Sequence, residues 1–396
     1  MSGLSTRAVA DDFEFGQLEM GERYDSAARA IQMPKSSVPT LSPFTVQATE
    51  NAIAQYQQIA AQGGWQPLPA GERLRLGMEA PDVLALRRRL IVTGDLAPSL
   101  GNSDIFDSYV EGGVRRFQSR HGIMATGVVG ETTRAAMDIP IDIRLQQLSN
   151  NIVRLRSMSG DLGKRYVMMN IPATEVEAVE NGVVEQRHAS IVGKPDRASP
   201  ELSARILNIN FNPFWTVPAS IIKKDLVPKM LADPTYLTRH SIRIFTPTGA
   251  ELQPEQVDWN SEEPLSLRFT QDPGSGNSMG AVRINIANEH GVYMHDTPAK
   301  SLFGQDYRFH SSGCARIQNV RDLCAWILRG TEYTREKIDE VIRSGERIDA
   351  RPVAVLPIYW VYVTSWATPE GVVQFRDDIY DKDGFASLAV IKKEQG

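Results

Sequence analysis

The pattern of hydrophobic and polar positions changes near residue 165, which predicts a helical part followed by a sheet. Before that point apolar residues recur at intervals of three and four, the spacing of one helix face. After it the period is two, as in strands that bury one side. The period-two positions and a β-rich run near the end are Val167, Met169, Ile171, Val282, Ile284, Ile286 and residues 353–363. We therefore expect an α+β fold.

The helical part divides into a lead-in, a scaffold helix and a compact module. A helix predicted over residues 46–61 stops at Gly63-Gly64, because glycine commonly follows a helix C-terminus. The three short helices of the module present Val83, Leu86 and Leu90, then Val110, Val114 and Phe117, then residues 132–137. The expected parts are a flexible arm (1–44), a scaffold helix and connector (45–73), the helical module (74–140), a linker helix (141–163) and a sheet domain (164–390).

One segment of the sheet domain does not follow the period of two. Residues 218–260 contain a charged helical stretch and no strand clear enough to join the sheet. We interpret this segment as an insertion that covers the site as a lid. The alternative is a long surface loop without function.

Length and composition limit the classes of protein. A chain of 396 residues suggests two or three domains, and 42% hydrophobic residues can form buried cores. The net charge of −5 gives no electrostatic case for binding nucleic acid or an anionic membrane. No apolar run is long enough to span a bilayer. The acidic first 30 residues show no secretory signal, so the protein either stays inside the cell or is a mature or trimmed form.

The chemistry centres on Cys314, which lies in a Ser-Ser-Gly-Cys-Ala-Arg turn with His295 and His310 upstream. A thiol needs a base to become a strong nucleophile near neutral pH, and imidazole is the usual partner. Backbone N–H groups at a Gly-Cys turn can hold an oxyanion. The segment therefore predicts a cysteine acyl-transfer site.

Two other interpretations of the cysteines and histidines are weaker. Two histidines and a cysteine can bind zinc, but no closely spaced ligand pair accompanies them, so we expect no metal. Cys324 occurs among apolar residues at helical spacing and is expected to be a packing residue. Two cysteines ten residues apart do not suggest a disulfide framework.

Several phrases of this sequence, in this order, carry a resemblance to a known family. They are Gly63-Gly64-Trp65, Phe117-Gln118 with Gly127-Val128-Val129-Gly130, residues 212–218, Tyr293-Met294-His295-Asp296-Thr297-Pro298, Ser311-Ser312-Gly313-Cys314-Ala315-Arg316 and residues 375–380. The chain resembles the periplasmic, YcbB-like L,D-transpeptidases, whose catalytic domain is of the YkuD type. The resemblance implies a sandwich-like domain with a mixed sheet and a capping insertion. It also implies that the three-helix module is a peptidoglycan-binding-like domain.

The resemblance also implies a reaction. Such enzymes cleave the bond between the third residue and the terminal D-alanine of a peptidoglycan tetrapeptide stem. The acyl group passes to the enzyme thiol and then to an amine of a neighbouring stem, giving a 3→3 cross-link. No cofactor is implied, carbapenems are expected to acylate the thiol, and the protein is expected in the periplasm, with its signal peptide removed or trimmed. The partners expected are stem peptides, with an outer-membrane protein or lipoprotein as an alternative acyl acceptor.

By the same resemblance, Cys314 is the nucleophile and His295 the general base. The backbone amides of Gly313 and Cys314 would hold the oxyanion, and Arg316 would anchor the loop or a substrate carboxylate. Ser312, which stands where many relatives have a histidine, would be one of the oxyanion or substrate-binding residues. His310 is a rival base, but His295 closes a strand beside a Thr-Pro turn and is the more rigidly placed.

Further expectations concern the groove and the basic helix face. Trp215 and Tyr236 are candidates for the groove wall, with core packing as the alternative. Three arginines of one helix are either a glycan-binding face or simply solvated: Arg115, Arg116 and Arg120. A thiol–imidazole pair predicts a pH–rate profile with two limbs between about pH 5 and 9.

Two other functions fit the same residues. A degenerate enzyme domain would leave a protein that only binds the cell wall. Transfer of the acyl group to water would make the protein an L,D-carboxypeptidase, and nothing in the motif distinguishes the acceptors.

Overall fold

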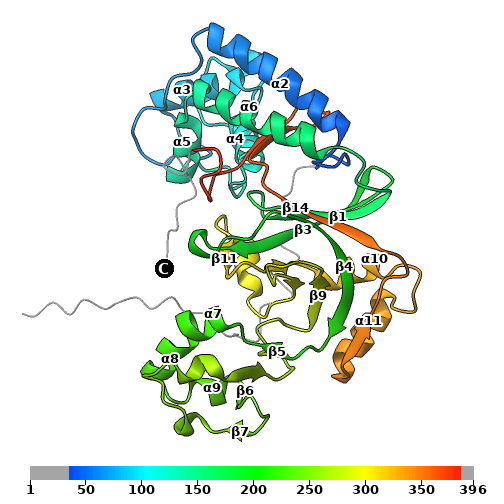
Figure 1. Ribbon diagram of the computed structural model, residues 1–396. Helices are drawn as coiled ribbons and strands as arrows, with labels where there is room; N and C mark the ends of the chain where they lie inside the picture. Colours follow the sequence, from blue (N-terminus) through cyan, green and yellow to red (C-terminus); the bar gives the residue numbers. More distant parts are fainter. Residues whose placement is uncertain (1–34, 385–396) are drawn as a thin grey trace, which may run out of the picture.

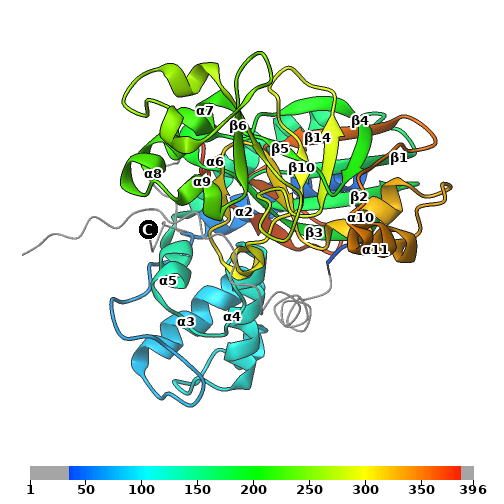
Figure 2. The same cartoon turned by 90° about the horizontal axis from the view of Figure 1, so that it is seen from below.

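The computed structural model describes residues 35–384 and shows three parts (Figure 1). Helices α2–α6 lie at one end, a large β-sheet lies in the middle, and an inserted subdomain lies at the other end. In the view from below, α3–α5 and the insertion form separate groups beside the sheet (Figure 2). Of the arm predicted over residues 1–44, residues 35–42 pack on the sheet. Residues 1–34 lie outside the residues that the structure describes. The predicted end of the sheet domain, residues 385–390, also lies outside.

The central sheet has ten strands among the described residues and closes through β3. The strands are β1 (Arg165–Asn170), β2 (Glu175–Glu180), β3 (Val183–Gly193), β4 (Leu202–Phe211), β9 (Val282–Ile286), β10 (Met294–His295), β11 (Phe309–Ser311), β12 (Ala315–Ile317), β13 (Ile348–Ala350) and β14 (Leu356–Val361). Their order is β11-β3-β12-β10-β9-β4-β14-β1-β2, with β13 beside β4. The first part of β3 pairs with β2, and its end pairs with β12 and β11. The sheet therefore curves back on itself, as expected for a sandwich-like α+β domain.

The main core lies between this sheet and two helices. Alternate residues of β1 and β9 are fully or almost fully buried, including Val167, Met169 and Ile284. Helices α10 (Val320–Ile327) and α11 (Arg335–Ser344) contribute further apolar side chains to the same cluster. Cys324 is one of them, with no exposed surface, which confirms it as a packing residue. Alternation of period two in the strands thus produced the buried face that the sequence predicted.

The insertion has a small sheet of its own, which the sequence did not reveal. Its elements are β5 (Trp215–Thr216), α7 (Ala219–Ile221), η3 (Ile222–Leu226), α8 (Val227–Ala232), α9 (Tyr236–Arg239), β6 (Ile242–Phe245), β7 (Glu251–Leu252), η4 (Pro254–Gln256), η5 (Glu263–Ser266) and β8 (Arg268–Gln271). The four strands are ordered β5-β8-β6-β7 and form a sheet separate from the central one. The expectation of a segment without a clear strand is corrected by β6. Its Ile-Arg-Ile-Phe sequence gives only two alternations, too few to distinguish from a loop.

The helical part has the elements that its periodicity predicted. They are α2 (Pro43–Ala61), α3 (Pro81–Val92), η1 (Pro98–Leu100), α4 (Ser108–Arg120), α5 (Glu131–Asp138) and α6 (Ile141–Met158). Leu86, Leu90, Val114 and Phe117 are fully buried in the core that α3–α5 share. Helix α2 begins at an N-cap, Ser42, whose hydroxyl accepts from the Thr45 amide. Within residues 35–384, no helix combines the length and apolar composition needed to cross a membrane.

The module is joined to the sheet domain by a packed interface. His121 stacks between Phe117, at 3.8 Å, and Phe375 of β16 (Val373–Phe375), at 5.4 Å. Strand β16 pairs with β15 (Ser365–Ala367). Arg120 donates to the Val373 carbonyl, and Arg376 donates to the Arg120 carbonyl. These ring stacks and hydrogen bonds fix the module on the chain that follows β14.

Of the three arginines expected on a basic face of α4, Arg120 is buried. It forms a two-point ion pair with Asp95, with distances of 2.8 and 2.6 Å. Arg116 donates to the Asp95 carbonyl, and Arg115 pairs with Glu111. Burial alone would lower the pKa of Arg120, but the Asp95 carboxylate more than offsets it. The prediction of a solvated or glycan-binding residue is wrong for Arg120, because the helix period alone cannot show that a second domain covers it, whereas the partners of Arg115 and Arg116 lie inside the module.

We predict that Arg120→Ala destabilises the protein by about 3–5 kcal/mol, because it leaves the Asp95 carboxylate buried without its partner. The measurement is the free energy of unfolding from urea denaturation. Arg156→Ala is the control, since Arg156 pairs with Glu50 with 59% and 34% of their side chains exposed. The control should cost less than about 1 kcal/mol. Equal losses of unfolding free energy in Arg120→Ala and Arg156→Ala would contradict a buried Arg120–Asp95 ion pair.

Candidate active site

The register of three adjacent strands places the candidate catalytic residues on one face. In the parallel pair β10–β12, Met294 lies beside Ala315 and His295 beside Arg316. The Ala315 amide donates to the Tyr293 carbonyl at 3.0 Å, which extends this pairing to Tyr293 and Cys314. Because side chains two residues apart in a strand share a face, Cys314 and His295 lie on the same side. A strand spacing of about 4.8 Å and a rise of about 3.3 Å per residue put their Cα atoms roughly 8 Å apart.

The opposite face of these strands belongs to the core. Met294 and Ala315, which alternate with the site residues, have no exposed surface and lie in the main cluster. On the site face, Tyr293 belongs to the apolar cluster of the insertion, and Cys314 packs against that cluster. Cys314 also packs against the main cluster, so the thiol lies where the insertion and the sheet domain meet.

The His295 ring is buried and neutral at physiological pH. Only 7% of the residue is exposed, and its Nδ1 atom has no hydrogen-bond partner among residues 35–384. Burial lowers the pKa of His295 to about 3, and the positive charge of Arg316 acts in the same direction. The backbone and carboxylate of Asp296 oppose these effects without cancelling them. A neutral imidazole can accept a proton, which is the requirement for a general base.

The Cys314 thiol is partly buried and is protonated in the resting site. Burial raises its pKa, although interactions with Tyr293 and the charges of Arg283 and Arg316 act to lower it. The thiol and the imidazole are thus both neutral before substrate binds. Proton transfer to His295 must accompany the attack of sulfur on a carbonyl.

The turn before Cys314 differs from expectation at two residues. Gly313 has φ of +109°, a conformation that favours glycine, and its N–H donates to Ser311 Oγ at 3.2 Å. The Gly313 amide therefore has an acceptor within the turn, which speaks against it as an oxyanion donor and leaves the Cys314 amide as the candidate. Ser312, expected among the substrate-binding residues, accepts a hydrogen bond at its Oγ from Arg197 at 3.0 Å.

Two arginines supply positive charge to the site. Arg316, expected to anchor the loop or a carboxylate, is 8% exposed, and burial lowers its pKa to about 10. Arg283 was not predicted; it lies opposite His295 in the β9–β10 pair, with its guanidinium 4.2 Å from the centre of the Tyr293 ring. The sequence did contain a signal for the position of Arg283, because residues 283 and 295 are equally far from the turn at residue 289. In a hairpin such residues face one another.

The insertion contributes an aromatic wall and a small pocket. Trp215 and Tyr236, both about nine-tenths buried, line the pocket. Its other lining residues are Ile221, Asp225, Leu226, Lys229, Ile242 and Ser278. Tyr293, which was not predicted, interacts through its side chain with both Trp215 and Cys314. The two expected groove residues thus lie in one pocket wall, and Tyr293 connects that wall to the thiol.

The rival base, His310, lies on a different strand with other partners. It belongs to β11, which β3 and β12 separate from β10. Its Nε2 atom is 3.0 Å from the Tyr307 carbonyl oxygen and 3.2 Å from Gln305 Oε1. The geometry favours His295. In the part of the chain that the structure describes, no group of three or more His, Cys, Asp or Glu side chains is arranged to hold a metal ion.

Two family models match this chain and agree with the fold. Residues 164–343 match the L,D-transpeptidase catalytic domain, and residues 79–137 match the "Putative peptidoglycan binding domain". The first match contains β1, β10, the Cys314 turn and the insertion, and the second contains α3–α5. The chain therefore combines a region similar to the L,D-transpeptidase catalytic domain with one similar to a peptidoglycan-binding domain.

The chain also matches individual L,D-transpeptidases over parts of its length. The chain is 30% identical over 247 residues to the "Putative L,D-transpeptidase" of Haemophilus influenzae, with 62% of this chain and 50% of that protein covered. It thus spans about half the length of that curated relative. An L,D-transpeptidase from Mycobacterium smegmatis matches with 14% identity and a TM-score of 0.25, covering 50% of this chain and 58% of that one. One from Stackebrandtia nassauensis matches with 12% identity and a TM-score of 0.27, covering 66% and 91%.

Proposed function

We propose that this protein is an L,D-transpeptidase that forms 3→3 cross-links in peptidoglycan through a Cys314 acyl-enzyme. The observation that carries the proposal is the strand register that puts Cys314 and His295 on one face, under the insertion. The order of the scaffold helix, helical module, sheet and capping insertion supports the YcbB-like subfamily. The proposal includes action outside the cytoplasm, in the periplasm, on the stem peptides of the cell wall.

In the first half-reaction, the thiol attacks the carbonyl carbon of the third residue of a tetrapeptide stem. The thiol proton passes to His295, and the Cys314 amide donates to the developing oxyanion. The positive charges of Arg283 and Arg316 stabilise negative charge near sulfur and oxygen. The carbon–nitrogen bond to D-alanine then breaks, and His295 returns its proton to the leaving amine. The result is a thioester on Cys314 and free D-alanine.

In the second half-reaction, an amine of a neighbouring stem attacks the thioester. His295 accepts a proton from this amine, the carbon–sulfur bond breaks, and the thiol is regenerated with that proton. The pocket lined by Trp215 and Tyr236 is a candidate site for the acceptor, because Tyr293 interacts with both Trp215 and the thiol and the lining is mostly apolar with a few polar groups. With a protein amine as the acceptor, the product would be a protein attached to peptidoglycan. With water as the acceptor, the product would be a tripeptide stem.

The test is product analysis with purified protein and disaccharide-tetrapeptides from peptidoglycan. Mass spectrometry should detect dimers whose mass equals two monomers minus one D-alanine, and tandem spectra should place the bond between the third residues. Products limited to tripeptides would replace this proposal with a carboxypeptidase. Binding to purified sacculi without any product would leave only a wall-binding protein.

A further inference from the structure

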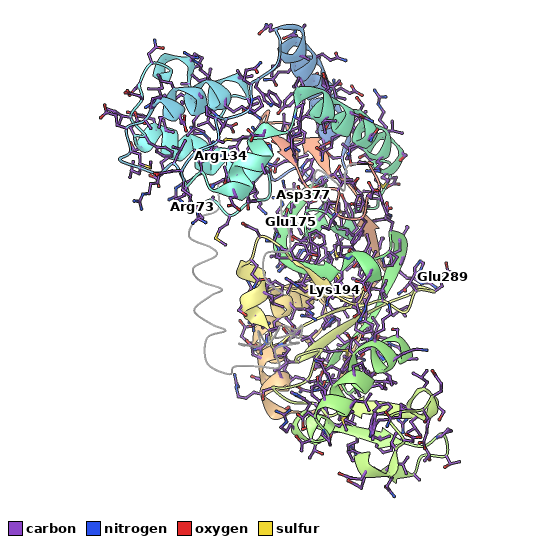
Figure 3. The ribbon with its side chains drawn as sticks, turned by 90° about the vertical axis from the view of Figure 1, so that its left-hand side faces the viewer. Arg73, Arg134, Glu175, Lys194, Glu289 and Asp377 are labelled. Atoms are coloured by element: carbon purple, nitrogen blue, oxygen red, sulfur yellow. The ribbon has the colours of Figure 1, made fainter. Side chains whose placement is uncertain are left out.

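A short turn after β3 holds all three residues that precede the nucleophile. The turn, residues 194–199, includes the 3-10 helix η2 (Pro195–Arg197). Its contacts are the Lys194 amide to the Ser311 carbonyl at 2.9 Å, Arg197 Nη1 to Ser312 Oγ at 3.0 Å and Ser199 Oγ to the Gly313 carbonyl at 2.8 Å. Lys194, which marks the turn, lies between the helical module and the insertion (Figure 3).

The backbone of this turn is packed tightly against itself. A Cβ atom on Gly193 would lie 2.2 Å from the Arg197 carbonyl oxygen and 2.6 Å from the Ser199 amide nitrogen. The Gly193 amide also donates to Ser199 Oγ at 3.0 Å. Only glycine fits at this position, and the turn acts as a rigid frame for the residues before Cys314.

Arg197 connects this frame to the insertion. Its Nη1 and Nη2 atoms lie 2.5 and 3.1 Å from the two carboxylate oxygens of Asp225. Both side chains are largely buried, with 15% and 17% exposed. Asp225 belongs to η3, between the buried Ile222 and Leu226, and it also lines the pocket beside Trp215. A planar guanidinium held at both carboxylate oxygens has its remaining N–H directions fixed.

We propose that Arg197 is a positioning residue through which the insertion aligns the nucleophile. With Asp225 in place, Arg197 Nη1 is held where it donates to Ser312, two residues before Cys314. When the insertion moves away, the guanidinium loses this anchor, and the turn loses one of its three contacts. Acylation of Cys314 therefore depends on the insertion being closed. This inference rests on the proposed function, since it assumes that Cys314 is the acylated group.

The test compares acylation rates of four variants with those of the unmodified chain. Arg197→Gln and Asp225→Asn should each slow acylation of Cys314 by a carbapenem about 10- to 100-fold, the scale expected when a reacting group is misplaced by a fraction of an ångström to 1 Å. The acylation rate of Arg197→Lys should lie between those of the unmodified protein and Arg197→Gln, because lysine keeps the charge but cannot form the two-point pair. The double variant Arg197→Gln/Asp225→Asn should acylate no more slowly than the slower of these two single variants, since each substitution removes the same Arg197–Asp225 link. Rates come from intact-mass spectrometry over time.

The matched control is Arg239→Gln, which removes an exposed ion pair with Asp233 in the same insertion. It should acylate at the unmodified rate. Melting temperatures, measured alongside, should stay within a few degrees for Arg197→Lys, whose partial rate loss then reports positioning and not unfolding. If the unmodified protein is not acylated, the proposed function itself fails. If it is acylated and the Arg197 and Asp225 variants keep its rate, or if their effects add, the link does not position the thiol and the inference is overturned.

Discussion

Cys314→Ala is expected to abolish both acylation by carbapenems and formation of 3→3 dimers. The alanine variant has no atom that can form a thioester, and its smaller side chain leaves His295 and the turn in place. Intact mass should show no adduct under conditions that label the unmodified protein completely. Dimer formation from disaccharide-tetrapeptides should fall below detection in the same preparations.

The second cysteine gives a matched control. Cys324 is fully buried in the main core, and burial raises its pKa well above its ordinary value. Cys324→Ala should therefore keep both acylation and dimer formation, with a modest loss of stability from the small cavity. An adduct that persists in Cys314→Ala and disappears in Cys324→Ala would reverse the assignment of the nucleophile.

His295→Gln is expected to slow acylation by about 10²–10⁴-fold at pH 7, the contribution typical of a positioned general base. Glutamine retains hydrogen-bonding groups of similar reach but cannot take the thiol proton. Rates of carbapenem acylation measure the effect. His310→Gln is the control and should stay within about twofold, because His310 lies on β11, away from β10, and its ring contacts the Tyr307 carbonyl. A larger loss in His310→Gln than in His295→Gln would exchange their roles.

The pH dependence of the acylation rate further distinguishes the unmodified protein from the His295→Gln variant. The sequence suggested two limbs between about pH 5 and 9, but burial moves both limbs outward. It lowers the pKa of His295 to about 3 and raises that of Cys314 above its ordinary value of 9.0. The unmodified protein should accordingly acylate at a nearly constant rate from pH 5 to 8. In His295→Gln the thiolate must form unaided, so the rate should rise roughly tenfold per pH unit over that range.

The sequence predicted those site residues that a single element positions. Alternation in a strand placed His295, and the Ser/Gly-rich turn before a helix distinguished Cys314, which is partly buried, from Cys324, which is fully buried. The apolar periods likewise predicted α3–α5 and β9. These signals are local, since a hydrophobic period of two or 3.6 residues can be recognised within a few consecutive residues of one element.

Contacts between distant segments left no such signal. Arg197 belongs to the short 3-10 helix η2 and Asp225 to the helical element η3, and the period of neither element shows that the two side chains meet. Arg120 was expected at a surface because its own helix is amphipathic, yet a strand more than 250 residues later covers it. The Gly313 amide was expected to face substrate, and only the rotamer of Ser311 shows that it is engaged within the turn.

The ring stack of Phe117, His121 and Phe375 determines how the two domains can cooperate. Domains on a flexible linker search a range of separations, and their effective concentration falls as the linker grows. Here the spacing is set by packed rings and buried hydrogen bonds. If the module holds a glycan strand, this fixed spacing would present the stems to the thiol at one distance and angle, and the stems would be selected by where they project from the strand.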